Sequence, residues 1–395
     1  MRVLLTSEAK FERTPDGTVW GAAAYGSAVW RRYLDVFSGV VMAARVADVS
    51  APSSGCVEAS GPGIEFCPLP SYSGLAGFCR RFSSVHAAIG QAVDDCPAVI
   101  VRSPSPIAYL TARHLSSSAR AYGAHIVGDP DQVFSRGAFS HPLRAPLRRI
   151  ATSAQVRLSQ RAVAVLFVTH KTLQRKYPTN GKAYSASDVA LDDAAFGSRP
   201  PRERGMPFTL VTVGALDQPY KGTSVLLDAV AQLRRRAVTV RLRIVGGGRL
   251  MPALRERART LGLESKVEFL GQLDSVGVRR ALDAADAFVM PSLTEGLPRA
   301  LLEAMAKGLP AVASDVGGIP ELLPPEFLVP PGRPEELAER ICWLMTAEVA
   351  REAAGVRNMS VARAHHGREQ AAIQRAFCES VYEASLACRT VTICA

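Results

Sequence analysis

The chain has 395 residues, of which 48% are hydrophobic and 21% charged. At roughly 150 residues per domain, this length predicts two domains with separate cores and excludes a miniprotein. The composition excludes a disordered or fibrous chain, and no apolar run approaches the roughly 20 residues of a membrane-spanning helix. The apolar start, Val3 to Leu5, is too short for a secretory signal. We therefore expect a cytoplasmic protein.

The net charge of +11 is unevenly placed. Six arginines follow one another without an acidic residue between the first and the last: Arg136, Arg144, Arg148, Arg149, Arg157 and Arg161. Such a patch attracts an anionic partner, which a phospholipid, a diphosphate-bearing acceptor or nucleic acid could supply. Nucleic acid is the least favoured, because aromatic residues do not interleave with the arginines. A solvated face is the alternative, since the chain is rich in Arg throughout.

The 8 cysteines form neither a CxxC pair nor a Cys/His cluster with zinc-ligand spacing. Ordinary thiols are the favoured interpretation, and no metal site is predicted.

Strand-sized apolar runs alternate with amphipathic stretches, which is typical of βαβ units and parallel sheets. In the first half we expect strands at Val3–Thr6, Gly39–Arg45, Ile64–Leu69, Ala98–Arg102, His125–Gly128 and Ala164–Val168. A polar stretch with a Pro pair, residues 184–207, reads as a linker. A second series follows at Phe208–Val213, Arg241–Val245, Val267–Leu270, Ala287–Met290, Ala311–Ala313 and Phe327–Val329.

These two series predict an α/β chain of two doubly wound, Rossmann-like domains that face each other across a ligand cleft. We place an acceptor-binding domain at 1–190 and a donor-binding domain at 191–366. The segment 367–395 is expected to form a terminal helix with a tail, and this helix could return to the first domain.

Loops at the strand ends of the second series carry the chemistry. In PSLTEGLP, Pro298 is expected in the first turn of a helix, where a residue without an amide hydrogen is accepted, and the amides of Arg299 and Ala300 suit a phosphate. Glu295 in that loop and Glu303 in the helix can each accept two hydrogen bonds from vicinal hydroxyls. Lys221 supplies a cation for a diphosphate. Glycines allow close approach of the backbone, at Gly214, Gly222, Gly246, Gly247 and Gly248.

The segment EGLPRALLEAMAKGLPAVASDVGGIPELL resembles the donor-binding signature of the large retaining GT-B glycosyltransferase family that includes sucrose synthases and bacterial mannosyltransferases. The motifs VGALDQPYKGTSVLLDA, LRIVGGGRL and VEFLGQL follow the order of that family, and the resemblance covers Phe208 to about Met345. In the first half, RRYLDVF, VRSPSP, VGDPDQVF and FVTHKTLQRKYP are similar to the subgroup encoded with exopolysaccharide and capsule genes.

The resemblance implies sugar transfer from a nucleotide diphosphate with retention, no metal, no cofactor and no protein nucleophile. It assigns the sugar hydroxyls to Glu295, the ribose to Glu303 and the diphosphate to Lys221. Gly26 would approach the phosphate from the first domain. The remaining donor contacts would come from the backbone at the base-binding and phosphate-binding loops, namely Phe269, Leu270, Gly271, Gly296, Leu297, Pro298, Arg299 and Ala300.

Two positions depart from the family pattern. Ala215 stands where the family commonly has an Arg, so one cation is missing, and Arg102 or Arg249 could compensate. Where many members have a His near the reacting carbon, this chain has Asp129, which is either catalytic or a turn residue before Pro130; Arg102 and His170 are alternatives.

A saccharide or lipid-linked acceptor at the inner membrane face fits this assignment, with the Arg136–Arg161 patch contacting anionic lipid and with no nucleic-acid partner. A nucleotide-sugar epimerase and a non-catalytic sugar-nucleotide binding protein are the alternatives. A dinucleotide oxidoreductase is disfavoured, because TSEAKFERTPDG after the first strand lacks GxGxxG.

Overall fold

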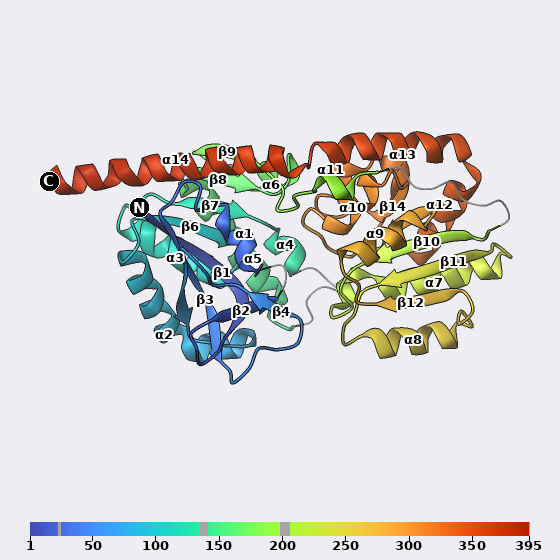
Figure 1. Cartoon of the computed structure of the whole chain (residues 1–395), viewed down its shortest axis with the longest axis horizontal. Helices are drawn as coiled ribbons and strands as arrows, with labels where there is room; N and C mark the ends of the chain where they lie inside the picture. The colour runs from blue at the N-terminus through green and yellow to red at the C-terminus, as the bar shows by residue number, and fades with distance from the viewer. Residues whose placement is uncertain (23–24, 135–140, 198–205, 395) are drawn as a thin grey trace. The chain divides into compact units, whose positions relative to one another are not determined.

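The computed structural model describes residues 1–22, 25–134, 141–197 and 206–394. Its contacts divide the chain into two compact units, whose elements are labelled in Figure 1. Unit 1 contains Met1–Pro130, Arg149–Ala186 and Ala371–Ala395. Unit 2 contains Asp131–Arg148 and Ser187–Gln370. The segment 131–148, from the first half of the sequence, therefore groups with the second unit.

A nine-stranded sheet forms the centre of unit 1. Its strands are β1 (Arg2–Arg13), β2 (Val19–Ala22), β3 (Gly39–Asp48), β4 (Cys56–Glu58), β5 (Ile64–Leu69), β6 (Ala98–Ser103), β7 (Gly123–Ile126), β8 (Ala164–Phe167) and β9 (Lys182–Ser185). The helices of the first half, with the terminal helix, are α1 (Ser27–Arg31), α2 (Gly74–Asp94), α3 (Pro106–Ser117), α4 (Pro130–Val133), α5 (Arg144–Arg161), α6 (Thr172–Lys176) and α14 (Gly367–Cys394).

The parallel strands of this sheet run in the order β5-β3-β1-β6-β7-β8-β9, while β2 and β4 pair antiparallel beside the far end of β1. Side chains from α2, α3 and α5 bury their apolar stripes in one core, against one set of alternating strand residues. Side chains from α1 and α14 belong to the other core. The sheet is thus covered by helices on both faces, as parallel sheets require.

The strand boundaries in unit 1 correct the sequence prediction in three places. β1 continues to Arg13, because polar residues after Thr6 still pair with β3, across an irregularity between Thr6 and Lys10. Strands β2, β4 and β9 are only 4, 3 and 4 residues long, too short to carry an apolar run that could have predicted them. β7 covers Gly123–Ile126, two residues earlier than expected, because the chain turns away before Gly128.

Helix α14 packs on unit 1 through Phe377, Cys378 and Val381. The strand residue beneath it is Gly123, where an added Cβ would lie 2.4 Å from Val381 Cγ2 and 3.0 Å from Phe377 Cζ. Only glycine at this position lets the helix lie so close to β7.

We therefore expect Gly123→Ala to lower the free energy of unfolding by about 1–3 kcal/mol, since overpacking of a filled core forces neighbours apart. Urea denaturation measures the loss, and faster proteolysis within 371–388 reports release of α14. Gly77→Ala is the matched control, because an added Cβ at Gly77 meets only ordinary contacts, 3.5 Å or more away. Equal stability of the Gly123 variant and the wild type would contradict the packing argument.

Unit 2 has a six-stranded parallel sheet in the order β12-β11-β10-β13-β14-β15. Its strands are β10 (Phe208–Val213), β11 (Val240–Val245), β12 (Val267–Gly271), β13 (Ala287–Met290), β14 (Ala311–Ser314) and β15 (Leu328–Val329). Its helices are α7 (Thr223–Arg235), α8 (Met251–Thr260), α9 (Ser275–Asp283), α10 (Arg299–Ala306), α11 (Ile319–Leu322), α12 (Pro334–Thr346) and α13 (Glu348–Arg363), with 3-10 turns η2 (Asp193–Ala195), η3 (Pro219–Lys221) and η4 (Pro325–Phe327).

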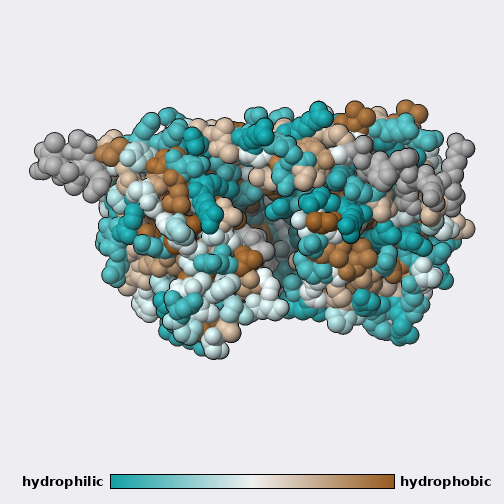
Figure 2. Space-filling view, viewed as in Figure 1, coloured by the Kyte–Doolittle hydropathy of each residue, from teal (hydrophilic) through white to brown (hydrophobic). Residues whose placement is uncertain are grey.

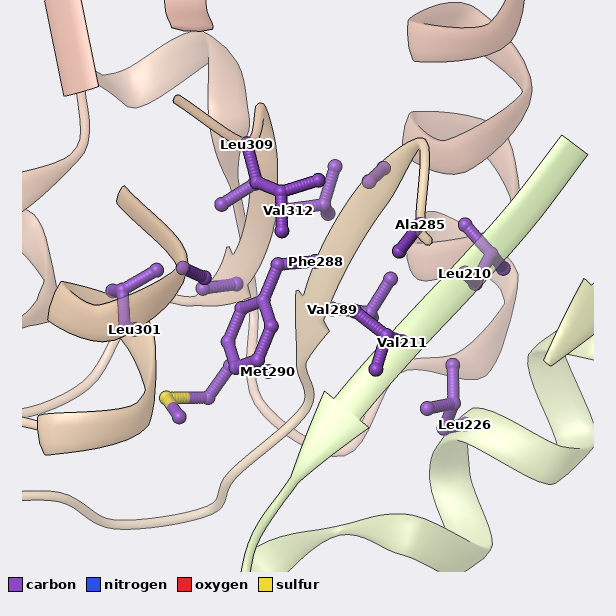
Figure 3. Close-up of a cluster of buried hydrophobic side chains, with 14 of the residues drawn as sticks. Leu210, Val211, Leu226, Ala285, Phe288, Val289, Met290, Leu301, Leu309 and Val312 are labelled. Atoms are coloured by element: carbon purple, nitrogen blue, oxygen red, sulfur yellow. The ribbon is translucent and has the colours of Figure 1, made fainter. Parts of the chain in front are cut away.

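The core of unit 2 explains why its strands are easy to recognise in the sequence. Central strands of a parallel sheet are buried on both faces and read as continuous apolar runs. Figure 3 shows Leu210 and Val211 of β10 beside Phe288, Val289 and Met290 of β13, and these residues are at most 4% exposed. Such strands hold the loops at their carboxyl ends in fixed positions.

No helix in the part of the chain that the structure describes is long and apolar enough to cross a membrane.

Candidate donor site in unit 2

The strand order of unit 2 determines where its loops converge. β11 and β12 lie on one side of β10, and β13, β14 and β15 lie on the other. Ligands of open parallel sheets bind beyond the carboxyl ends of the strands where the order reverses, here between β10 and β13. A pocket opens at that point and is lined by residues that include Gly214, Lys221 and Ser292.

Lys221 and Glu295 meet at the edge of this pocket. Lys221 Nζ lies 2.7 Å from Glu295 Oε1, and the Ser292 hydroxyl donates to the same oxygen at 2.8 Å. The Glu295 side chain is only 9% exposed, so its charge is largely desolvated and depends on this cation. The structure therefore brings together Glu295 and Lys221, which the sequence analysis identified in two separate loops.

Three glycines let the loops around this pair pack backbone against backbone. An added Cβ at Gly222 would lie 1.9 Å from the Pro291 carbonyl oxygen, and one at Gly317 would lie 1.9 Å from that of Glu295. One at Gly246 would lie 1.9 Å from the carbonyl oxygen of Gly214. These contacts require glycine at Gly222 and Gly246 for loop packing, and a close approach of either residue to a ligand stays a prediction.

The helix that follows the acidic loop begins at Arg299, with Pro298 as its N-cap in extended conformation. Pro298 thus lies one residue before the helix rather than in its first turn, and the amides of Arg299 and Ala300 still open the helix. Glu303 accepts from Arg299 Nε at 2.9 Å. A ribose hydroxyl at Glu303 would share this carboxylate with Arg299. Gly296, Leu297 and Ala300 are partly exposed in the same segment.

The residues predicted to contact the base lie at the ends of β11 and β12. Gly246 donates to the carbonyl of Gly271, which aligns the two loops. The amide of Gly247 donates to Gln272 Oε1 at 3.3 Å. The Arg255 guanidinium carbon lies 5.0 Å from the centre of the Phe269 ring. Phe269, Leu270 and Gly271 are partly exposed at this edge, and beyond its chain neighbours no heavy atom of the described residues lies within 4 Å of the position of a Cβ on Gly271.

The candidates for the missing cation lie in different units. Arg249 belongs to unit 2, where its amide and Nε donate to Asp217, at 3.0 Å to the carboxylate and 2.8 Å to the carbonyl. This pair fixes the loop after β11 to the loop after β10 and leaves the exposed guanidinium at the donor edge. Arg102 belongs to unit 1, where it contacts His125 Nδ1 at 3.3 Å. Compensation for Ala215 by either residue stays a prediction.

Asp129 also belongs to unit 1 and is 8% exposed. Its Oδ2 lies 2.7 Å from Lys176 Nζ, and its Oδ1 accepts from the hydroxyl of Tyr177. A carboxylate held this way positions the end of β7, and its catalytic role stays a prediction. Gly26 is the N-cap of α1 in the same unit, and His170 follows β8.

A second polar cluster lies at the corresponding reversal point of unit 1, between β1 and β6, and sequence reasoning missed it. Glu8 occupies the irregular stretch of β1, where it accepts from the Tyr72 hydroxyl at 2.7 Å. Arg45 lies 3.4 Å from the Glu8 carboxylate, and its guanidinium covers the Tyr72 ring at 4.7 Å. The polar residues that interrupt the apolar run after Thr6 were the available signal. Irregular strand pairing of this kind often re-aims a side chain beside a site.

Burial raises the pKa of Glu8 above its usual 4.5, and the Tyr72 and Arg45 contacts only partly oppose this. The folded state therefore binds the proton more tightly than the unfolded state, and stability falls as the pH rises from about 4.5 through the raised pKa. We expect the free energy of unfolding of the wild type, relative to Glu8→Gln, to decrease between pH 4 and pH 7. Denaturant titrations across this range test it, and a pH-independent difference would refute it.

Comparison with known proteins shows which proteins this chain resembles. Residues 207–347 match the model for "Glycosyl transferases group 1". The chain is 24% identical over 336 residues to Protein CapJ from Staphylococcus aureus, which covers 84% of this chain and 83% of that protein. It is 36% identical over 166 residues to the putative colanic acid biosynthesis glycosyltransferase WcaL from Escherichia coli, across 40% of this chain and 41% of that protein. Anabaena HepE in complex with UDP-glucose superposes with a TM-score of 0.66 at 18% identity, across 97% of this chain and 100% of that one.

The fold and these matches define the class: the chain has a GT-B fold of two Rossmann-like domains and is similar to curated glycosyltransferases. Within it, residues 207–347 match the group 1 glycosyl transferases. This segment contains Lys221, Glu295 and Glu303 and every other predicted donor-binding residue except Gly26.

Proposed function

We propose that the protein transfers a sugar from a nucleotide diphosphate to a hydroxyl acceptor, with retention and without a metal. The observation that carries the proposal is the Lys221–Glu295 pair at the strand-order reversal of unit 2. A cation and a carboxylate side by side suit a ligand that has a diphosphate next to a polyhydroxyl ring.

In this mechanism the departing diphosphate carries the developing negative charge. Lys221 and the leading amides of α7 and α10 stabilise it, and such preorganised electrostatics is commonly the largest catalytic contribution. Glu295 orients the sugar through its hydroxyls, and Glu303 binds the ribose. Retention rests on the resemblance of the 286–323 motif, and the leaving phosphate oxygen takes the acceptor's proton, so no protein nucleophile is needed.

A saccharide or lipid-linked acceptor in polysaccharide biosynthesis is the favoured partner. WcaL supports this, since it is described as a putative colanic acid biosynthesis glycosyltransferase and is similar to this chain. We propose that unit 1 binds the acceptor at its own strand-order reversal, beside Glu8.

We also propose that the Arg136–Arg161 patch contacts an anionic membrane. The described arginines of this patch differ in their contacts within the protein. Arg136 lies outside the described residues. Arg144 donates to the Phe134 carbonyl, and Arg148 pairs with Asp131. The exposed remainder is Arg149, Arg157 and Arg161.

A panel of nucleotide sugars tests the proposal, because a ligand that binds the folded state raises its thermal stability. A stabilising donor should also yield a glycosylated product by mass spectrometry, with NMR reporting the anomeric configuration and chelator leaving the rate unchanged. Interconversion of the donor sugar without an acceptor would favour an epimerase. Stabilisation without turnover on any acceptor would favour a binding protein.

A further inference from the structure

Helices α2, α3 and α5, which cover one face of the unit 1 sheet, form a positively charged layer. Within unit 1 this layer exposes six arginines, namely Arg80, Arg81, Arg113, Arg149, Arg157 and Arg161. Along these fully described helix segments the only acidic residue is Asp94, at the last position of α2. The helices adjoin one another: α2 and α3 share a core with α5, and Tyr109 of α3 donates to Gln155 of α5 at 2.9 Å.

Arginine-rich composition alone does not account for this layer, because the arginine-bearing helices α7, α8 and α9 of unit 2 also carry acidic residues, namely Asp228, Glu256 and Asp283. Arg257 of α8 binds Asp228 of α7 at 2.7 Å, and Arg259 binds Glu256 at 2.6 Å. In contrast, among the described residues none of the six layer arginines donates a hydrogen bond or pairs with a carboxylate. Their charge is uncompensated within the protein and is available to an external anion.

Apolar side chains stand among these arginines. Phe82 on α2 is 45% exposed and Ile150 on α5 is 65% exposed. The Phe82 ring stacks on His86, with Phe78 at its edge. A helical surface that combines arginines with exposed apolar groups suits the boundary between lipid headgroups and acyl chains. A nucleic acid would gain from the cations but would leave Ile150 without a favourable contact.

We infer that the α2–α3–α5 layer docks unit 1 on an anionic phospholipid bilayer. The arginines contact the headgroup phosphates, while Phe82 and Ile150 enter the interface. This inference extends the membrane contact proposed above, since it replaces a sequence run with a surface built from three helices.

Binding of the full chain to vesicles tests the inference. The layer variant combines Arg81→Gln, Arg113→Gln and Arg157→Gln, one from each helix. The matched control combines Arg235→Gln, Arg241→Gln and Arg280→Gln, which are exposed arginines of unit 2 and give the same change in net charge. Each arginine near an anionic membrane contributes roughly a fivefold gain in affinity, so three contribute on the order of 100-fold.

We expect sedimentation with phosphatidylcholine vesicles that contain phosphatidylglycerol to weaken about 100-fold for the layer variant at low salt. The control triple should bind like the wild type. Equal losses in both triples, or equal wild-type binding to pure phosphatidylcholine, would overturn the inference. So would loss of oligonucleotide binding by the layer variant while its vesicle binding persists, because the partner would then be nucleic acid.

The apolar part of the surface has its own control. Phe82→Ser with Ile150→Ser should weaken the vesicle binding that survives at high salt. Val349→Ser with Val356→Ser should leave that binding unchanged, although these α13 valines are 82% and 75% exposed. Figure 2 shows hydrophobic residues at the surface over α13. A larger loss of vesicle binding in the Val349 and Val356 variant than in the Phe82 and Ile150 variant would refute the docking surface. Titration with nucleoside diphosphates, done without vesicles, is expected to be unchanged in all four variants, so failure of the donor site is detected separately.

Discussion

Glu295→Gln should lower kcat/KM for transfer by about 10²- to 10⁴-fold while leaving nucleoside diphosphate affinity intact or improved. The carboxylate is proposed to accept two hydrogen bonds from sugar hydroxyls, and each charge-assisted bond contributes roughly 1.5–3 kcal/mol. The free nucleotide has no such hydroxyls. Removing the negative charge also releases Lys221, which lies 2.7 Å away in the structure, to interact with the diphosphate.

Kinetics with a competent donor and calorimetry with the nucleoside diphosphate separate these two effects. Glu264→Gln, at an exposed position of the same unit, serves as the control for a change of one charge. A parallel loss of nucleotide affinity in Glu295→Gln would show that the carboxylate supports the fold of the loop rather than the sugar.

Lys221→Met should raise the dissociation constant for the nucleoside diphosphate by about 10- to 100-fold, since one charge-assisted contact to the phosphates is lost. It should also lower stability, because the Glu295 side chain would keep only the Ser292 hydroxyl as a partner while remaining largely buried. Calorimetry and urea denaturation measure the two effects.

A double variant distinguishes the two roles of this lysine. Lys221→Met combined with Glu295→Gln should recover stability, because no buried charge is left unpaired, but should not recover nucleotide affinity. Lys266→Met, a partly exposed lysine in the same unit, is the control. If the double variant regained affinity, Lys221 would act only by neutralising Glu295.

The donor unit could be predicted closely from sequence because its information is local. Strand β10 was expected at Phe208–Val213 and is found there, and β13 and its loop also match. Continuous apolar runs mark buried strands, and Gly, Lys and Glu at their ends mark the loops. The pairing of Lys221 with Glu295 was not predictable, since 74 residues separate them.

The site residues of unit 1 were harder to predict, because their contacts join residues that lie far apart in the sequence. Glu8 and Tyr72 are 64 residues apart, and neither belongs to a motif. The arginine run was visible, but whether an arginine faces solvent or binds a carbonyl depends on helix orientation. Arg148 and Arg149 are neighbours in sequence, yet only the first pairs with a carboxylate, and other exposed arginines of the same helix layer, Arg81 and Arg113, lie on other helices.

The backbone contacts around the donor pocket limit how the specificity of this enzyme can change. Any side chain at Gly222 or Gly317 would collide with main-chain carbonyl groups, so substitutions there disrupt the loops around the pocket instead of adjusting it. Gly271, at the end of β12, has open space around it, but its φ of +71° makes any side chain there strained. Attempts to alter nucleotide preference by mutagenesis should therefore concentrate on the exposed Gln272, where a new side chain can be accommodated without moving Lys221 or Glu295.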